Sequence, residues 1–148
     1  MSRKKAREIA LHLIFEYGFG TFEAANVREE CLSEEILSLI SGEISLYAGK
    51  LSESQVDYIV SVVTGVAEHL DELDGVIRET SQGWSFKRLS RITVAILRLA
   101  LYEMRYVEDV PTGAAINEAV ELAKIYDSPE AASFINGILG TVSRAQEG

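Results

Sequence analysis

The segment from Leu89 to Met104 constrains the fold of this 148-residue chain more than any other. Its apolar residues occur nearly all round a helical projection, which is typical of a helix buried among other elements. Ser85 precedes the segment as a candidate N-cap. Val110-Pro111 ends it, because proline donates no backbone hydrogen bond and disfavours helix at the residue before it. The apolar positions of this predicted central helix are Leu89, Ile92, Val94, Ala95, Ile96, Leu97, Leu99, Ala100, Leu101 and Met104.

The rest of the chain also predicts helices, because its apolar residues recur three and four positions apart. β-branched residues are frequent between Val56 and Leu70, but this spacing over more than ten residues favours a helix over a strand. A capping-box pattern, Ser52 to Gln55, begins that helix. Residues 18–32 are expected to form a loop, with room for one short helical piece. The predicted helices are a first one that ends near residue 18, followed by 33–49, 52–83, 85–110, 112–126 and 128–142.

These elements predict an all-α protein, a single compact domain over residues 1–148 with about six to seven helices. No repeat, low-complexity tract or Pro/Gly-rich linker divides the sequence. Apolar residues make up 47% and charged residues 25%, as in globular proteins. No apolar run approaches the roughly 20 residues of a membrane span. Glu8 and His12 interrupt the stretch that a signal peptide would need, so none is expected.

The titratable residues do not predict an enzyme. Cys31 is the single cysteine and has no partner for an internal disulfide, and neither it nor His12 and His69 shows the close spacing of zinc ligands. The glycines form neither a P-loop nor a dinucleotide fingerprint. We therefore expect no catalysis, no cofactor, no metal, a reducing cytoplasmic setting, and an exposed His12 on the first helix.

The start of the chain is basic, although the net charge of −9 repels nucleic acid at long range. Arg3, Lys4, Lys5 and Arg7 place four cations in the first seven residues, here called the basic helix start. Arg3, Lys4 and Arg7 fall off the apolar stripe and are expected to face solvent or a ligand. Lysine and arginine neutralise phosphates, so the basic helix start is a candidate nucleic-acid site, with a solvated arm as the alternative.

Two further features are candidates from the residues alone. Three arginines spaced by seven lie on the central helix, and we expect this polar stripe to pair with acids rather than bind a ligand. Phe134 lies one position from the apolar stripe of the last helix, so packing at the edge of the core is favoured over an exposed ring. Exposed aromatic rings stack unpaired bases. The arginines are Arg91, Arg98 and Arg105, and the acids considered are Asp109, Glu118 and Glu121.

Four stretches resemble the NusB family of transcription antitermination factors. They span nearly the whole chain at family-like separations, whereas residues 19–50 match poorly. The stretches are the basic helix start running into Ala6-Arg-Glu-Ile-Ala-Leu11, Ala95-Ile-Leu-Arg-Leu-Ala-Leu-Tyr-Glu103, Asp109-Val-Pro111 with Ala115-Ile-Asn-Glu-Ala-Val-Glu-Leu-Ala-Lys124, and Phe134-Ile-Asn-Gly-Ile-Leu139.

The resemblance implies a helical bundle that binds the boxA element of nascent RNA together with NusE, a small-subunit ribosomal protein. The two would help assemble an antitermination complex on bacterial RNA polymerase, notably on ribosomal RNA operons. By position, the basic helix start matches the family's arginine-rich opening and Phe134 its base-stacking aromatic, while Glu130 falls where the family often has another acid. Lysine at positions 4 and 5 departs from that opening, and lysine lacks the bidentate fork of arginine.

Other functions remain open at this point. A similar helical module resembles the N-terminal part of some RNA cytosine methyltransferases, although no methyl-donor domain is present in this sequence. A helical interaction or dimerisation module without RNA contact is a third interpretation. A homodimer that covers the basic helix start is compatible with all of them.

Overall fold

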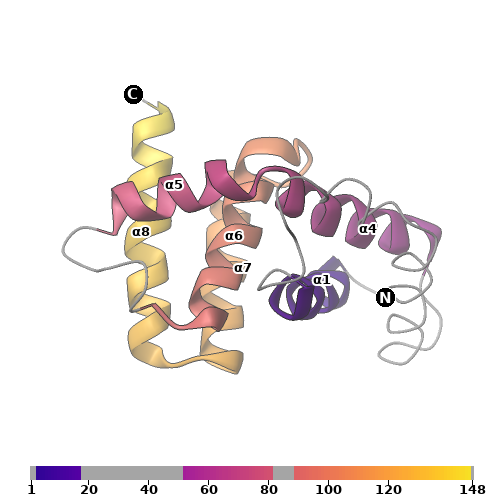
Figure 1. Cartoon of the computed structure of the whole chain (residues 1–148), viewed down its shortest axis with the longest axis horizontal. Helices are drawn as coiled ribbons and strands as arrows, with labels where there is room; N and C mark the ends of the chain where they lie inside the picture. Colours follow the sequence, from indigo (N-terminus) through magenta and orange to yellow (C-terminus); the bar gives the residue numbers. More distant parts are fainter. Residues whose placement is uncertain (1–2, 18–51, 82–88, 148) are drawn as a thin grey trace. The chain divides into compact units, whose positions relative to one another are not determined.

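The computed structural model describes residues 3–17, 52–81 and 89–147, and six helices lie in these ranges (Figure 1). These ranges hold no strand, which confirms the predicted all-α class. Three predicted features lie outside the described residues: the loop at 18–32, the helix at 33–49 and the candidate cap Ser85. The helices are α1 (Arg3–Tyr17), α4 (Glu53–Glu68), α5 (Leu70–Thr80), α6 (Arg91–Tyr106), α7 (Thr112–Tyr126) and α8 (Pro129–Glu147).

The chain divides into two compact units, residues 1–68 and 69–148. The single domain expected over residues 1–148 is not tested by this division and stays a prediction. In the first unit α1 packs against α4. The predicted capping box is present at the start of α4. The Ser52 backbone N–H donates to Gln55 Oε1 at 2.9 Å, and the Gln55 N–H donates to Ser52 Oγ at 3.2 Å. The buried residues of this pair of helices include Ile9, Leu13, Ile14, Ile59, Val62, Val63 and Val66.

The long helix predicted over 52–83 is wrong, because the chain leaves the helix at His69. This residue has φ −109° and ψ 20°, and it separates α4 from α5. The apolar residues Val66, Leu70, Leu73 and Ile77 keep a spacing of three and four across the break. Periodicity alone therefore could not locate it.

In the second unit α6 is the central helix, as predicted. It is buried continuously from Thr93 to Leu101, and it packs against α5, α7 and α8. Its start was predicted wrongly, because Leu89 lies outside the helix and Ser90 is the N-cap, with Ser90 Oγ accepting the Thr93 N–H at 3.1 Å. Pro111 separates α6 from α7, which confirms the predicted break.

Arg98 and Arg105 of α6 pair with acids that belong to α5. The buried Arg98 donates from Nε and Nη2 to the two carboxylate oxygens of Asp74, each at 2.8 Å. Arg105 Nη1 lies 2.7 Å from Glu72 Oε2 nearer the surface. The expected pairing is confirmed for these two, although the sequence did not identify α5 as the helix that supplies the acids.

In the described part of the chain, no helix combines the length and apolar character needed to cross a membrane.

Candidate nucleic-acid interface

The basic helix start forms the first turns of α1, as predicted. This end of the helix has no acidic residue in its first turn. Lys4 is exposed and Lys5 is half-buried, so both have access to solvent. Cations at a helix N-terminus oppose the macrodipole, so these lysines contribute nothing favourable to the helix there. Arg3 belongs to α1, and its side chain lies outside the described part.

Arg7 does not face solvent, which corrects the expectation from the sequence. Its exposed fraction is 6%, although it lies off the predicted apolar stripe. Leu11, one turn further along the same flank, is fully buried. The buried face of α1 is therefore wider than the stripe, and an apolar residue at i+4 was the signal that could have shown it. His12 is exposed, as predicted.

The start of α8 positions the other two predicted residues. Ser128 Oγ accepts the Ala131 N–H at 3.0 Å, which confirms the predicted cap before Pro129. Glu130 is exposed in the first turn, where the positive end of the helix dipole favours a carboxylate. Phe134 follows one turn later and is half-buried, so its ring is partly accessible. Residues four apart share a helix face, so these two side chains lie on one side of α8.

A chain of hydrogen bonds fixes the turn that leads into α8. Ser90 Oγ donates to Thr93 Oγ1 at 2.9 Å, and Thr93 Oγ1 donates to Asp127 Oδ2 at 2.5 Å. Asp127 also donates its backbone N–H to the Ala123 carbonyl at 2.8 Å. These contacts join the start of α6 to the turn between α7 and α8. These contacts therefore help to fix the start of α8, the helix that carries Phe134.

The structure brings together two of the six predicted site residues on α8 and places the other four on α1. Glu130 and Phe134 belong to the unit of residues 69–148, and the basic helix start belongs to the unit of residues 1–68. Of the residues whose burial is described, Lys4, Lys5, Glu130 and Phe134 have the accessibility that a surface site requires, and Arg7 does not.

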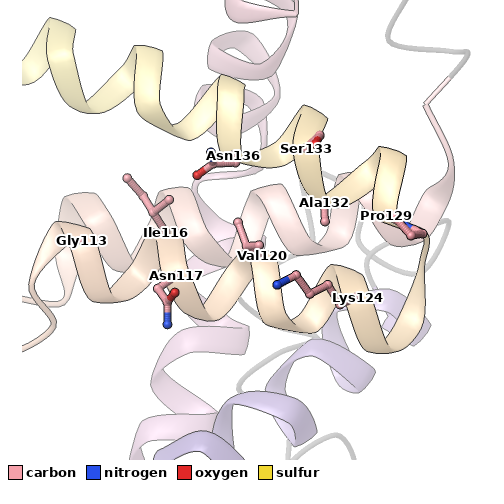
Figure 2. A pocket seen from close by; sticks show the side chains of 9 residues that line it. All are labelled: Gly113, Ile116, Asn117, Val120, Lys124, Pro129, Ala132, Ser133 and Asn136. Carbon is pink, nitrogen blue, oxygen red and sulfur yellow. The ribbon is translucent and has the colours of Figure 1, made fainter.

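A groove of about 560 Å³ runs between α7 and α8 (Figure 2). Side chains of α7 form one edge and side chains of α8 the other. Asn136 on its α8 edge lies two positions from Phe134, and two positions turn a helix by about 200°. The groove therefore faces away from the Phe134 side of α8. Its lining is Gly113, Ile116, Asn117, Val120, Lys124, Pro129, Ala132, Ser133 and Asn136.

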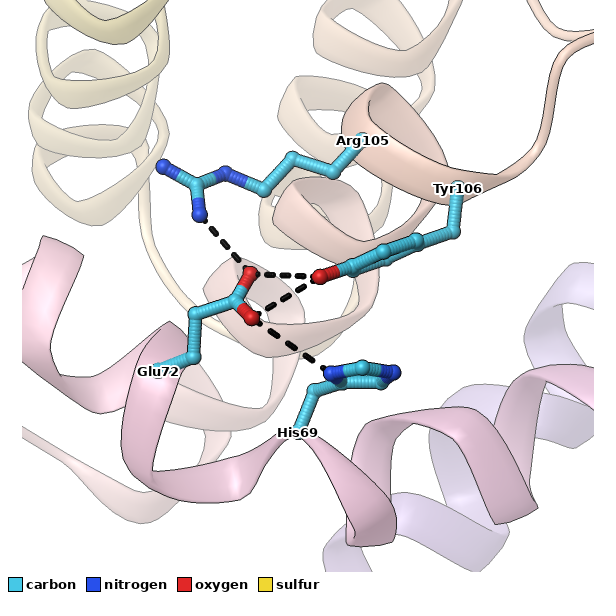
Figure 3. A network of polar contacts seen from close by, with 4 residues as sticks. All are labelled: His69, Glu72, Arg105 and Tyr106. Atoms are coloured by element: carbon cyan, nitrogen blue, oxygen red, sulfur yellow. Dashed lines mark hydrogen bonds and ion pairs between the residues drawn. The ribbon is translucent and has the colours of Figure 1, made fainter.

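A polar network joins the start of α5 to the end of α6, and the sequence did not reveal it (Figure 3). Tyr106 Oη donates to Glu72, with both carboxylate oxygens 2.8 Å away, and His69 Nδ1 lies 3.4 Å from Oε1. Hydrogen bonds from Arg105 and then from Tyr106 lower the pKa of Glu72 below its ordinary value of 4.5. The bond to Glu72, followed by desolvation, raises the pKa of Tyr106.

Across residues 3–17, 52–81 and 89–147 no three histidine, cysteine, aspartate or glutamate side chains gather in a way that could hold a metal ion. The fold and these surfaces define a class, that of small all-α proteins with a basic helix start. Comparisons with known proteins then place the chain within this class.

A model of the NusB family matches residues 4–144. The transcription antitermination protein NusB of Acetivibrio thermocellus is 41% identical over 99% of this chain and 91% of its own length. The NusB protein of Carboxydothermus hydrogenoformans is 40% identical over 97% of this chain and 93% of its own length. The chain belongs to the NusB family, which confirms the resemblance seen in the sequence.

Solved structures show the same fold. T. maritima NusB matches with a TM-score of 0.77 and 25% identity, covering 97% of this chain and 92% of that one. The antitermination factors NusB and NusE have also been crystallised with double-stranded RNA. A chain of that complex matches with a TM-score of 0.76 and 21% identity, over 97% of this chain and 96% of that one.

Proposed function

We propose that this protein is an RNA-binding transcription antitermination factor. It binds the boxA element of nascent RNA, notably ribosomal RNA, together with NusE, and it helps assemble an antitermination complex on bacterial RNA polymerase. The observation that carries this proposal is the 41% identity to a transcription antitermination protein over nearly the full length of both chains. The similar fold of a chain in the crystal structure of NusB and NusE with double-stranded RNA supports the choice of partners.

We propose that Arg3, Lys4 and Lys5 contact phosphates and that Phe134 stacks on an unpaired base beside Glu130. The exposure of Lys4, the half-burial of Lys5 and the partly accessible ring of Phe134 support these roles. Single-stranded RNA is bound through stacking and backbone charge, which these residue types supply. Arg7 is left out of the phosphate contacts because it is 6% exposed.

The proposed function includes no catalytic step, and its setting is the cytoplasm, where bacterial RNA polymerase works. The names of the relatives describe antitermination, which supports a binding role for this chain. A homodimer that covers the basic helix start would compete with RNA. Light scattering with and without RNA tests for it, and a dimer that dissociates when RNA is added is the result that supports competition.

The deciding experiment measures binding of labelled boxA RNA by fluorescence anisotropy, with and without purified NusE. The RNA is supplied both as a single strand and as a duplex, because the related complex holds double-stranded RNA. We expect the single strand to bind and NusE to tighten that binding. Equal binding of boxA and a scrambled strand in the presence of NusE would contradict the proposal.

The role of Phe134 is tested with Phe134→Leu, which keeps an apolar side chain at the edge of the core and removes the ring. Loss of one stacked base costs about 1–3 kcal/mol, so affinity for boxA should fall by at least about fivefold. Val142→Leu is a matched control that changes an apolar residue further along α8. If Phe134→Leu binds boxA as well as the parent, the ring does not stack on RNA.

A further inference from the structure

Three aromatic rings lie together where α5 begins and α6 ends. They belong to His69, Tyr102 and Tyr106, here called the ring cluster. His69 stacks on Tyr106 with ring centroids 4.4 Å apart and an interplanar angle of 23°. Tyr102 lies 5.2 Å from Tyr106 and 6.1 Å from His69. The rings therefore form one continuous aromatic surface within the second unit.

This surface is accessible and at the same time fixed. Tyr106 is 42% exposed, and the His69 side chain is 35% exposed. The Glu72 carboxylate accepts the Tyr106 hydroxyl and an Arg105 N–H, which holds the tyrosine ring in place (Figure 3). A ring that served only to tie α5 to α6 would be expected to be buried. An exposed ring held in one orientation has already lost the conformational entropy that binding would otherwise cost.

The charge around the ring cluster favours a cationic ligand. Asp71 is exposed beside Glu72 in the first turn of α5, and Glu108 and Asp109 are exposed in the turn that follows Tyr106. Within the described segments 69–72 and 102–109, Arg105 is the single lysine or arginine, and it is paired with Glu72 at 2.7 Å. An acidic rim repels RNA phosphates and attracts lysine and arginine. Ring faces attract the same cations through their negative quadrupole, most often arginine.

The hydrogen bond of Tyr106 strengthens this attraction. The hydroxyl donates to a carboxylate, which draws the proton away from the phenol oxygen and leaves more negative charge on the ring. A guanidinium stacked on such a ring would also lie close to the acidic rim. Tyrosine and arginine are the residue types that most often carry binding energy in protein interfaces.

We propose that the ring cluster is a docking point for arginine or lysine side chains of a protein partner. This surface is distinct from the residues proposed to bind RNA, and it does not depend on RNA binding. The acidic rim would steer the partner by charge, and the fixed rings would hold one of its cationic side chains.

An NMR titration with an arginine-rich peptide tests the proposal. The control peptide has citrulline in place of arginine, which keeps the shape and removes the charge. We expect the arginine peptide to shift the ring signals of His69, Tyr102 and Tyr106 and the citrulline peptide to leave them unchanged. Equal shifts with both peptides, or none with either, would overturn the proposal. Larger shifts of the same rings with single-stranded RNA would assign the surface to nucleic acid instead.

Two substitutions of Tyr106 separate the ring from its hydrogen bond. Tyr106→Ala should weaken binding of the arginine peptide about two- to fivefold, as expected for an exposed cation–π contact. Tyr106→Phe should keep most of the affinity because the ring remains. Tyr126→Ala is the control, since Tyr126 is 38% exposed elsewhere in the same unit. A Tyr106→Ala variant that is folded, as shown by its thermal unfolding, and binds like the parent would contradict the proposal. The peptide titration of the unmodified protein decides the question if that variant fails to fold.

Discussion

The burial of Arg7 changes the expected salt dependence of RNA binding. The four cations of the basic helix start would give a log–log slope of about −2.8, at about 0.7 per phosphate contact with a single strand. Arg7 is 6% exposed, so three cations remain to contact phosphate and the slope becomes about −2.1. The double variant Lys4→Ala/Lys5→Ala should lower the magnitude of the slope further, to about 0.7.

The measurement is boxA anisotropy over a series of salt concentrations, with thermal unfolding to show that each variant is folded. Lys124→Ala is the matched control, because Lys124 is an exposed cation on α7 that pairs with Glu121. It should leave both affinity and slope unchanged. A parent slope of −2.8 or steeper would refute the reasoning, because it would show more phosphate contacts than the accessible cations can make. A double variant with the parent's slope would refute the site itself.

Three further predictions concern the helices that carry the surfaces. Arg98→Ala leaves the buried Asp74 carboxylate without its partner and should lower the free energy of unfolding by about 3–5 kcal/mol in urea, whereas replacing both residues by apolar ones should restore much of it. The pKa of Glu72 is lowered in the folded protein, so the ionised carboxylate stabilises the fold fully above its unfolded pKa, near 4.5, and this stabilisation is lost as pH falls through the folded pKa. The difference in unfolding free energy between the parent and Glu72→Gln should therefore be constant at neutral pH and shrink in acid. Ser128→Ala removes the α8 cap and should cost about 0.5–2 kcal/mol in thermal unfolding, while Ser133→Ala on the exposed side of the helix should cost much less.

Helix ends were predictable where the capping chemistry is local. The Ser52 and Gln55 pattern and the Ser128-Pro129 start both contain the donor and acceptor of the cap within four residues. The cap of α6 was missed because Leu89 fits the apolar pattern, which placed Ser90 inside the predicted helix and left Ser85 as the candidate cap. The hydrogen bond from Thr93 to Asp127 joins Ser90 to a turn more than thirty residues away, and such a contact leaves no local pattern.

The site residues divide in the same way. Helical periodicity placed Phe134 at the edge of a buried stripe, and its half-burial agrees with that position. Periodicity failed for Arg7 because the width of a buried face depends on what packs against it. The ring cluster was missed for a related reason. His69 and Tyr106 meet only when α5 packs against α6, and neither residue belongs to a motif.

The two proposed binding surfaces of the second unit can be tested independently, because they lie at opposite ends of α6. The turn before α8 is bonded to Thr93 near the start of this helix, and Tyr106 is its last residue. The thirteen residue steps from Thr93 to Tyr106 span about 20 Å of helix. Neither Phe134→Leu nor Tyr106→Ala changes a charge, so each substitution acts through the contacts at its own end.

Phe134→Leu should therefore weaken boxA binding and leave the arginine peptide unaffected, while Tyr106→Ala should do the reverse. Both ligands are titrated against both variants and the parent. If either substitution weakens both ligands in variants that remain folded, the two surfaces are coupled through the packing of α6. The assignment of separate roles to the two ends of this helix would then be wrong.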